Sequence, residues 1–137
     1  MSALLTRDNA IIEVNAAADY TAKEGYSVTL GETSGDATAT VSASASVIAP
    51  AIILDADWSS VSSTGKARVA VLGAVKGTVK VKLSGTVTVG DRLQQHTDGT
   101  FITDAASGTR VVSFRALESG VSGDLIEAAP LTPLALS

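Results

Sequence analysis

Short apolar runs separated by turn residues make up most of this chain, and the pattern is clearest between Gly85 and Glu127. Runs rich in Val, Thr, Ile, Phe and Leu alternate there with Gly and Gly-Asp pairs. Because Gly and Asp suit tight turns and short apolar runs suit strands, this region predicts a series of antiparallel strands. In the expected turns, glycine adopts positive φ and aspartate accepts hydrogen bonds from nearby backbone N–H groups. These turn residues are Gly90, Asp91, Asp98, Gly99, Gly108, Gly120, Gly123 and Asp124.

The first half of the chain carries a weaker form of the same pattern. Alternating apolar and polar residues predict strands at 26–30 and 78–83, and the most apolar run, 47–54, predicts a third. Segment 32–46 consists of small residues around a Ser-Gly-Asp turn, which favours an edge strand and leaves a flexible loop as the alternative. The polar composition of 55–66 predicts a loop around Trp58.

The two ends of the chain are expected to lie outside this strand pattern. Residues 1–15 are interpreted as an N-terminal arm, with a short strand signal from Ile11 to Val14, and residues 132–137 as an extended C-terminal tail. Between them, 16–131 should form one β domain. The sequence therefore predicts an all-β fold, a small single-domain barrel or sandwich with an extended N-terminal arm.

Composition narrows the classes of function. Of the 137 residues, 45% are apolar but only 4% are aromatic, so the core must be built from Ala, Val, Leu and Ile. There is no cysteine, which excludes disulfides and thiol chemistry. The net charge of −4 lacks the basic footprint that nucleic acids require, and the longest apolar run is too short to span a bilayer. We therefore expect neither a nucleic-acid partner nor a membrane partner.

No group of residues predicts catalysis, a metal site or a cofactor. His96 is the single histidine and lies in an expected turn, so a histidine-based triad or metal site cannot form within one chain. Asp55 and Asp57 lie two residues apart just before Trp58, but the oxygen ligands and glycine of a calcium loop do not follow them. They are interpreted as solvated turn acids and remain the only candidates for an enzyme's carboxylate pair. We expect that the protein is not an enzyme.

The order of several short motifs resembles the small head decoration, or capsid cement, proteins of tailed bacteriophages. The motifs are Ala18–Val28, Val87–Leu93 (VTVGDRL), Asp98-Gly99, Ala116–Gly120 (ALESG) and Gly123–Glu127 (GDLIE). The resemblance implies a compact β-barrel or β-tulip-like domain that forms a homotrimer. It also implies a virion protein, made in the host cytoplasm, that binds the major capsid protein on the outer capsid surface. Such a protein stabilises the head by bridging neighbouring capsid subunits.

Two hypotheses about surfaces follow. In the first, residues 1–14 become ordered on the capsid, and Ile11 to Val14 pair with an exposed strand edge there. Its proposed contacts are Leu4, Leu5, Arg7, Ile11, Ile12 and Val14. The alternative function is a carbohydrate-binding β domain exposed on a virion or cell surface, with Trp58, Tyr20 and Tyr26 as a stacking platform. Core packing is the competing interpretation of these aromatic residues.

Overall fold

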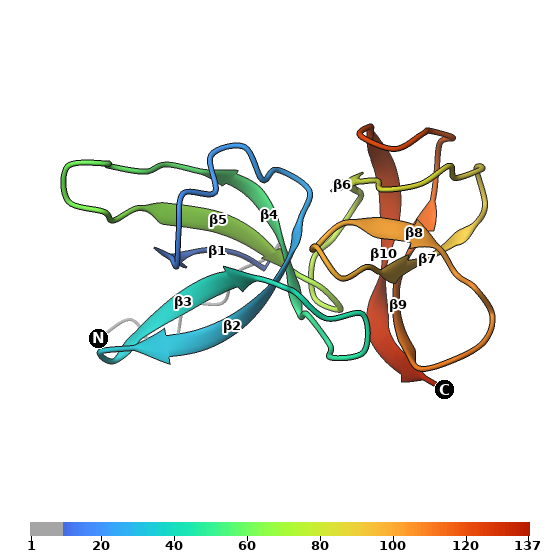
Figure 1. Cartoon of the computed structure of the whole chain (residues 1–137), viewed down its shortest axis with the longest axis horizontal. Helices are drawn as coiled ribbons and strands as arrows, with labels where there is room; N and C mark the ends of the chain where they lie inside the picture. The colour runs from blue at the N-terminus through green and yellow to red at the C-terminus, as the bar shows by residue number, and fades with distance from the viewer. Residues whose placement is uncertain (1–9) are drawn as a thin grey trace.

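The computed structural model describes residues 10–137, which form strands joined by loops and turns (Figure 1). Five strands close into a barrel in the order β1-β3-β2-β4-β5, which we call the N-terminal barrel. The other five form a sheet in the order β6-β10-β9-β7-β8, called the C-terminal sheet. The all-β prediction is confirmed. Within residues 10–137, no helix is long and apolar enough to cross a membrane.

The bounds of the strands are as follows. The barrel contains β1 (Ile11–Ala16), β2 (Ser27–Thr33), β3 (Asp36–Val41), β4 (Ala51–Ala56) and β5 (Lys66–Val71). The C-terminal sheet contains β6 (Val79–Lys82), β7 (Arg92–Gln95), β8 (Phe101–Thr103), β9 (Arg110–Ala116) and β10 (Leu125–Leu136).

Strand β1 closes the barrel, which corrects the prediction of an arm over 1–15. Residues Ile11 to Asn15 pair antiparallel with β5, and Asn15 and Ala16 pair parallel with β3. Val14 is buried in the barrel core, and Ile12 packs against that core. These residues are therefore committed to the fold, and Ile11 to Val14 are not a loose segment that waits for a capsid strand. The other proposed contacts, Leu4, Leu5 and Arg7, lie outside the described residues.

Segment 32–46 contributes an internal strand instead of the expected edge strand. β3 lies between β1 and β2, and it pairs with β2 over its whole length. The barrel interior explains the small residues, because Ala39, Ala51 and Ala67 are fully buried beside Val28 and Val69. A narrow barrel is filled by side chains of this size, so weak hydrophobicity is here a sign of tight packing.

The C-terminal residues extend β10, which corrects the prediction of a tail over 132–137. Leu134, Ala135 and Leu136 pair with β9 after an irregularity that follows Pro130. Pairing between β10 and β6 ends at Ala128. The prolines at 130 and 133 therefore lie where β10 has β9 on one side and no strand of the described chain on the other, a position that tolerates the missing N–H.

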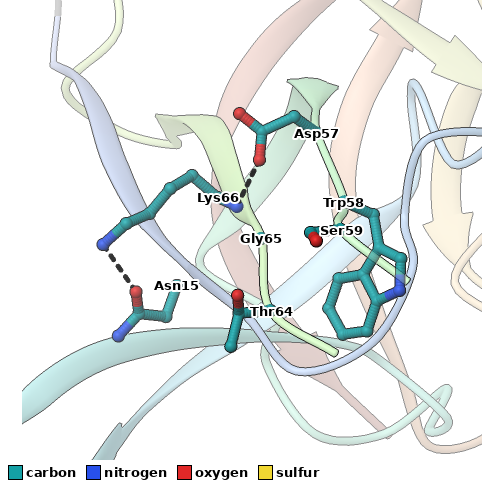
Figure 2. Close-up of a pocket in the computed structure, with 7 residues that line it drawn as sticks. All are labelled: Asn15, Asp57, Trp58, Ser59, Thr64, Gly65 and Lys66. Atoms are coloured by element: carbon teal, nitrogen blue, oxygen red, sulfur yellow. Dashed lines mark hydrogen bonds between the residues drawn. The ribbon is translucent and has the colours of Figure 1, made fainter. Parts of the chain in front are cut away.

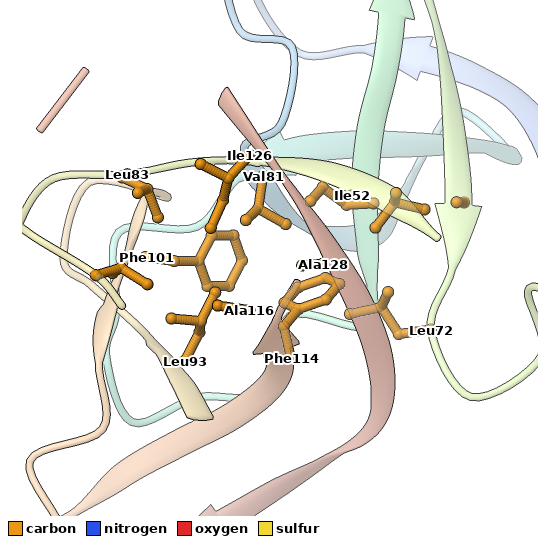
Figure 3. Packing of buried hydrophobic residues seen from close by; sticks show 13 residues of the cluster. Ile52, Leu72, Val81, Leu83, Leu93, Phe101, Phe114, Ala116, Ile126 and Ala128 are labelled. Atoms are coloured by element: carbon orange, nitrogen blue, oxygen red, sulfur yellow. The ribbon is translucent and has the colours of Figure 1, made fainter. Parts of the chain in front are cut away.

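One buried hydrophobic cluster joins the barrel to the C-terminal sheet (Figure 3), and a second cluster fills the interior of the barrel. Ile52 of β4 and Leu72, directly after β5, belong to the same buried cluster as Phe101 and Phe114 of the sheet. Backbone bonds also join the two parts, because the Lys82 N–H donates to the Gly25 carbonyl at 3.0 Å. Burial of a common apolar surface makes the stability of each part depend on the other.

Candidate binding surfaces and pockets

Large apolar side chains are exposed at several separate places on the described surface. These residues are Val47, Ile48, Val61, Val89, Leu117, Val121 and Leu134. Val47 and Ile48 lie together in the loop between β3 and β4, and Val61 lies in the loop between β4 and β5. Exposed apolar groups that are close together often mark contact sites with another protein. Val47 and Ile48 differ from the other exposed residues because hydrogen bonds from a buried side chain hold their loop in place.

A buried glutamine holds this loop in place. Gln95 of β7 is 0% exposed, and its Nε2 donates to the carbonyls of Ser44 at 3.2 Å and Val47 at 2.8 Å. Its Oε1 accepts a hydrogen bond of 2.9 Å from the N–H of Ala49. The side-chain amide of Gln95 therefore makes the hydrogen bonds that a neighbouring strand would otherwise make with the loop backbone. Val47 and Ile48 are presented to solvent from a rigid segment, which lowers the entropy cost of binding through them.

A buried ion cluster lies at the start of β9. Asp104 accepts hydrogen bonds from Arg110 and, at 2.7 Å, from Arg92. The side chains of Asp104 and Arg110 are 5% and 7% exposed, whereas Arg92 is 43% exposed. Burial alone would raise the pKa of Asp104, but hydrogen bonds from Arg110 and the Ala106 N–H, with the Arg110 charge, lower it overall. The cluster ties the 104–110 loop to β7 and β9, and sequence reasoning missed it.

The structure places the predicted turn residues in or beside turns. Positive φ angles occur at Gly90 (94°), Gly99 (85°), Gly108 (78°) and Gly123 (93°). The carboxylates of Asp91, Asp98 and Asp124 accept hydrogen bonds from the backbone N–H groups of Thr88, Thr100 and Val121. Gly120 is needed for a different reason, because a Cβ there would lie 2.8 Å from the side chain of Ile126.

The acids and the histidine weighed as chemical candidates are not brought together. Asp55 pairs with Arg68 at 2.5 Å, and the hydrogen bond from Arg68 is the main cause of the lowered pKa of Asp55. Asp57 accepts a hydrogen bond of 2.9 Å from the backbone N–H of Lys66. His96 is half-buried in the turn before β8. Across residues 10–137, no three His, Asp or Glu residues are grouped as metal ligands would be.

The three aromatic residues suggested as a stacking platform do not share one exposed surface in the structure. Tyr20 is buried in the barrel core, and its hydroxyl accepts a hydrogen bond of 3.0 Å from the Val41 N–H. Tyr26 packs against the same core, with the ammonium of Lys23 4.7 Å from its ring centre. Trp58 is half-buried and belongs to neither core cluster. Only Trp58 of the three lines a pocket described below.

Two adjoining pockets lie at one end of the barrel, where β1, β2 and β4 end and β3 and β5 begin. The Trp58 pocket has a volume of about 350 Å³ and is shown in Figure 2. Its lining residues are Asn15, Asp57, Trp58, Ser59, Thr64, Gly65 and Lys66. The threonine pocket, of about 370 Å³, is lined by Asn15, Ala16, Ala17, Thr33, Thr38, Ser63, Thr64 and Gly65. Asn15, Thr64 and Gly65 are common to both.

Trp58 lies close against the backbone at Gly65. A Cβ at position 65 would be 2.9 Å from Cε3 of the indole and 2.1 Å from the carbonyl oxygen of Asp57, so only glycine fits there. On the other side of this segment in Figure 2, the Lys66 ammonium donates to Oδ1 of Asn15 at 2.6 Å. The pocket thus combines one apolar ring with an amide and two opposite charges.

Comparison with known proteins identifies the fold. Neither a protein-family model nor a curated protein matches this sequence. Among solved structures, the chain is similar to the N base of head fiber gp8.5 from bacteriophage phi29. The match has a TM-score of 0.64 and 18% identity, and it covers 93% of this chain and 98% of the phage chain. Both the barrel and the C-terminal sheet must therefore have counterparts in that base.

Proposed function

We propose that this protein is a structural component of a bacteriophage head that binds the outer surface of the capsid. The observation that carries the proposal is the match to the base of a phage head fiber along almost the whole of both chains. The turn motifs between Val87 and Glu127 support it independently, because their order resembles that of head decoration proteins. Since the structural match rests on backbone geometry and the resemblance on sequence, the two are separate arguments for a phage head.

The mechanical role that we propose is that of a cement protein. Three copies would bind at a three-fold position and bridge neighbouring major capsid subunits, so that avidity adds to the affinity of each copy. The loop held by Gln95 supplies a rigid apolar contact, Val47 and Ile48, for such binding. The apolar residues Leu4 and Leu5 of the N-terminal segment supply a second.

The proposal is tested by co-sedimentation of the purified protein with expanded phage heads assembled without it. We expect saturable binding, and imaging of the decorated heads should show added density at the three-fold and quasi-three-fold positions. Heads bound at those positions should also resist heating better than bare heads. Absence of binding across salt and pH would refute attachment to the head surface.

Deletion of residues 2–9 should weaken binding to these heads by at least about tenfold, a change of about 1.4 kcal/mol. The deletion stops before Ala10 because its carbonyl accepts a hydrogen bond of 3.0 Å from the Val71 N–H, which helps to hold β1 in the barrel. Thermal unfolding of the shortened chain, measured alongside, separates the loss of a capsid contact from a loss of stability. Equal binding by the full and shortened chains would show that the N-terminal segment is not a capsid contact.

The double variant Val47→Ser and Ile48→Ser should also bind heads more weakly, by about tenfold, because it removes an apolar contact of the kind that dominates interfaces. Both side chains are exposed, at 57% and 43%, so the fold should be little affected. Val61→Ser is the matched control, since Val61 is 97% exposed on a different loop. If both variants lose the same affinity, the loop held by Gln95 has no specific role.

A further inference from the structure

We propose that the two adjoining pockets at one end of the N-terminal barrel bind a neutral saccharide, which stacks on Trp58 and extends into the threonine pocket. The Trp58 pocket and the threonine pocket share three lining residues and have volumes of about 350 and 370 Å³. Each volume lies within the range of small-molecule sites, and together they suit a ligand of two or three sugar rings. This activity is separate from head attachment, so the failure of either proposal leaves the other standing.

Trp58 provides the apolar surface that saccharide recognition requires. Sugar rings present a face of C–H groups, and a flat indole can cover that face while its N–H remains available to polar partners. The ring is half-buried, and its approach to the backbone at Gly65 limits its movement. A platform that is already fixed loses little conformational entropy when a ligand binds.

The threonine pocket provides hydroxyl groups in positions that a polyhydroxylated ligand can use. Oγ1 of Thr38 is buried and has no hydrogen-bond partner in the described structure. Thr33, Ser63 and Thr64 line the same pocket, and Ser63 has a positive φ of 54°, an uncommon conformation for serine. A ligand cannot reach the buried Oγ1 of Thr38 directly, so the hydroxyls that remain available to it are those of the exposed residues Thr33, Ser63 and Thr64.

The charges around the site favour a neutral ligand over an anionic one. The Trp58 pocket contains one carboxylate, Asp57, and one ammonium group, Lys66, so their formal charges cancel. The Lys66 ammonium is already engaged with Oδ1 of Asn15 at 2.6 Å, which leaves the amide NH₂ of Asn15 as a donor. Asp57 uses one oxygen to accept from the Lys66 backbone, and its other oxygen can accept from a sugar hydroxyl.

The single tryptophan allows a direct test with the full chain. Maltotriose and tri-N-acetylchitotriose serve as neutral probes, and glucuronic acid serves as the charged comparison. We expect at least one neutral probe to cause a saturable change in Trp58 fluorescence, with a matching binding isotherm by calorimetry. Glucuronic acid should bind more weakly. If neither neutral probe gives a saturable signal, or if glucuronic acid binds more tightly than both, the proposal is overturned.

Three substitutions in the pockets and one control outside them locate the binding at this site by calorimetry. Trp58→Ala should weaken binding by at least about tenfold, and Trp58→Phe by less, because a smaller ring remains. Thr33→Val keeps the shape of the side chain but removes an exposed hydroxyl of the threonine pocket, and it should also weaken binding. Val61→Ala, in the same loop but outside both pockets, should bind as the unchanged protein does. Unchanged affinity in Trp58→Ala would place any saccharide binding elsewhere and refute the inference.

Discussion

Replacement of Asp104 by asparagine is expected to lower the free energy of unfolding by about 3 to 5 kcal/mol. The substitution keeps the size of the side chain but removes the charge that faces Arg110, whose side chain is only 7% exposed. A buried guanidinium without its carboxylate partner is strongly destabilising. Arg92 is 43% exposed and can turn to solvent, so most of the cost should arise at Arg110. Chemical denaturation of the purified protein measures the change.

A second ion pair serves as the matched control for this prediction. Asp55 and Arg68 also form a carboxylate–guanidinium pair, but their side chains are 57% and 53% exposed. Asp55→Asn should therefore cost no more than about 1 kcal/mol, because solvent screens an exposed pair. The double variant Asp104→Asn and Arg110→Met should recover much of the lost stability by removing the unpaired charge. Equal losses at the two aspartates would contradict the importance of burial.

The loss of stability caused by Asp104→Asn should depend on pH. The pKa of Asp104 is lowered in the folded protein, so its carboxylate stabilises the fold above the unfolded pKa of about 3.9. That contribution is lost as the pH falls through the folded pKa. The difference in stability between the unchanged protein and Asp104→Asn should therefore be full near neutral pH and shrink below about pH 4. A difference that stays constant into strong acid would show that the charge is not its source.

The turns could be predicted from the sequence because the residues that form each turn lie within a few positions of one another. A glycine with φ near 90°, such as Gly90, and an aspartate that accepts from a backbone N–H three residues away, such as Asp91, leave a signal within a few residues. Barrel closure is not local, because β1 must meet β5 more than fifty residues further along the chain. Short strand signals at the chain end therefore could not be distinguished from an arm.

The features of the candidate surfaces were hidden for a related reason. Gln95 lies in a strand with ordinary polar and apolar neighbours, and only the folded chain shows that its amide replaces a backbone partner for the 44–49 loop. The threonine pocket combines residues of β1, the β2–β3 hairpin and the β4–β5 loop, which are distant in sequence. The polar composition around Trp58 predicted its loop, but the sequence left a stacking platform and core packing as alternatives for its side chain.

Replacement of Phe114 by alanine should cost about 3 to 5 kcal/mol of stability and should destabilise the barrel as well as the C-terminal sheet. Phe101 and Phe114 are the only phenylalanines, both are fully buried, and their rings meet edge to face with centres 5.0 Å apart (Figure 3). The remaining core side chains are mostly small aliphatic groups that cannot fill the space. The cavity would lie in the cluster that also contains Ile52 and Leu72.

Trp58 makes it possible to observe the barrel separately, because it lies in the loop between β4 and β5. If the cluster that joins them couples the two parts, thermal unfolding of Phe114→Ala followed by Trp58 fluorescence should shift as far as unfolding followed by circular dichroism. Val14→Ala, in the separate core of the barrel, should likewise shift both signals together. A fluorescence transition that stays in place while a second, earlier transition appears by circular dichroism would mean that the sheet unfolds alone. Coincident transitions would instead show that the barrel and the C-terminal sheet unfold as one cooperative unit.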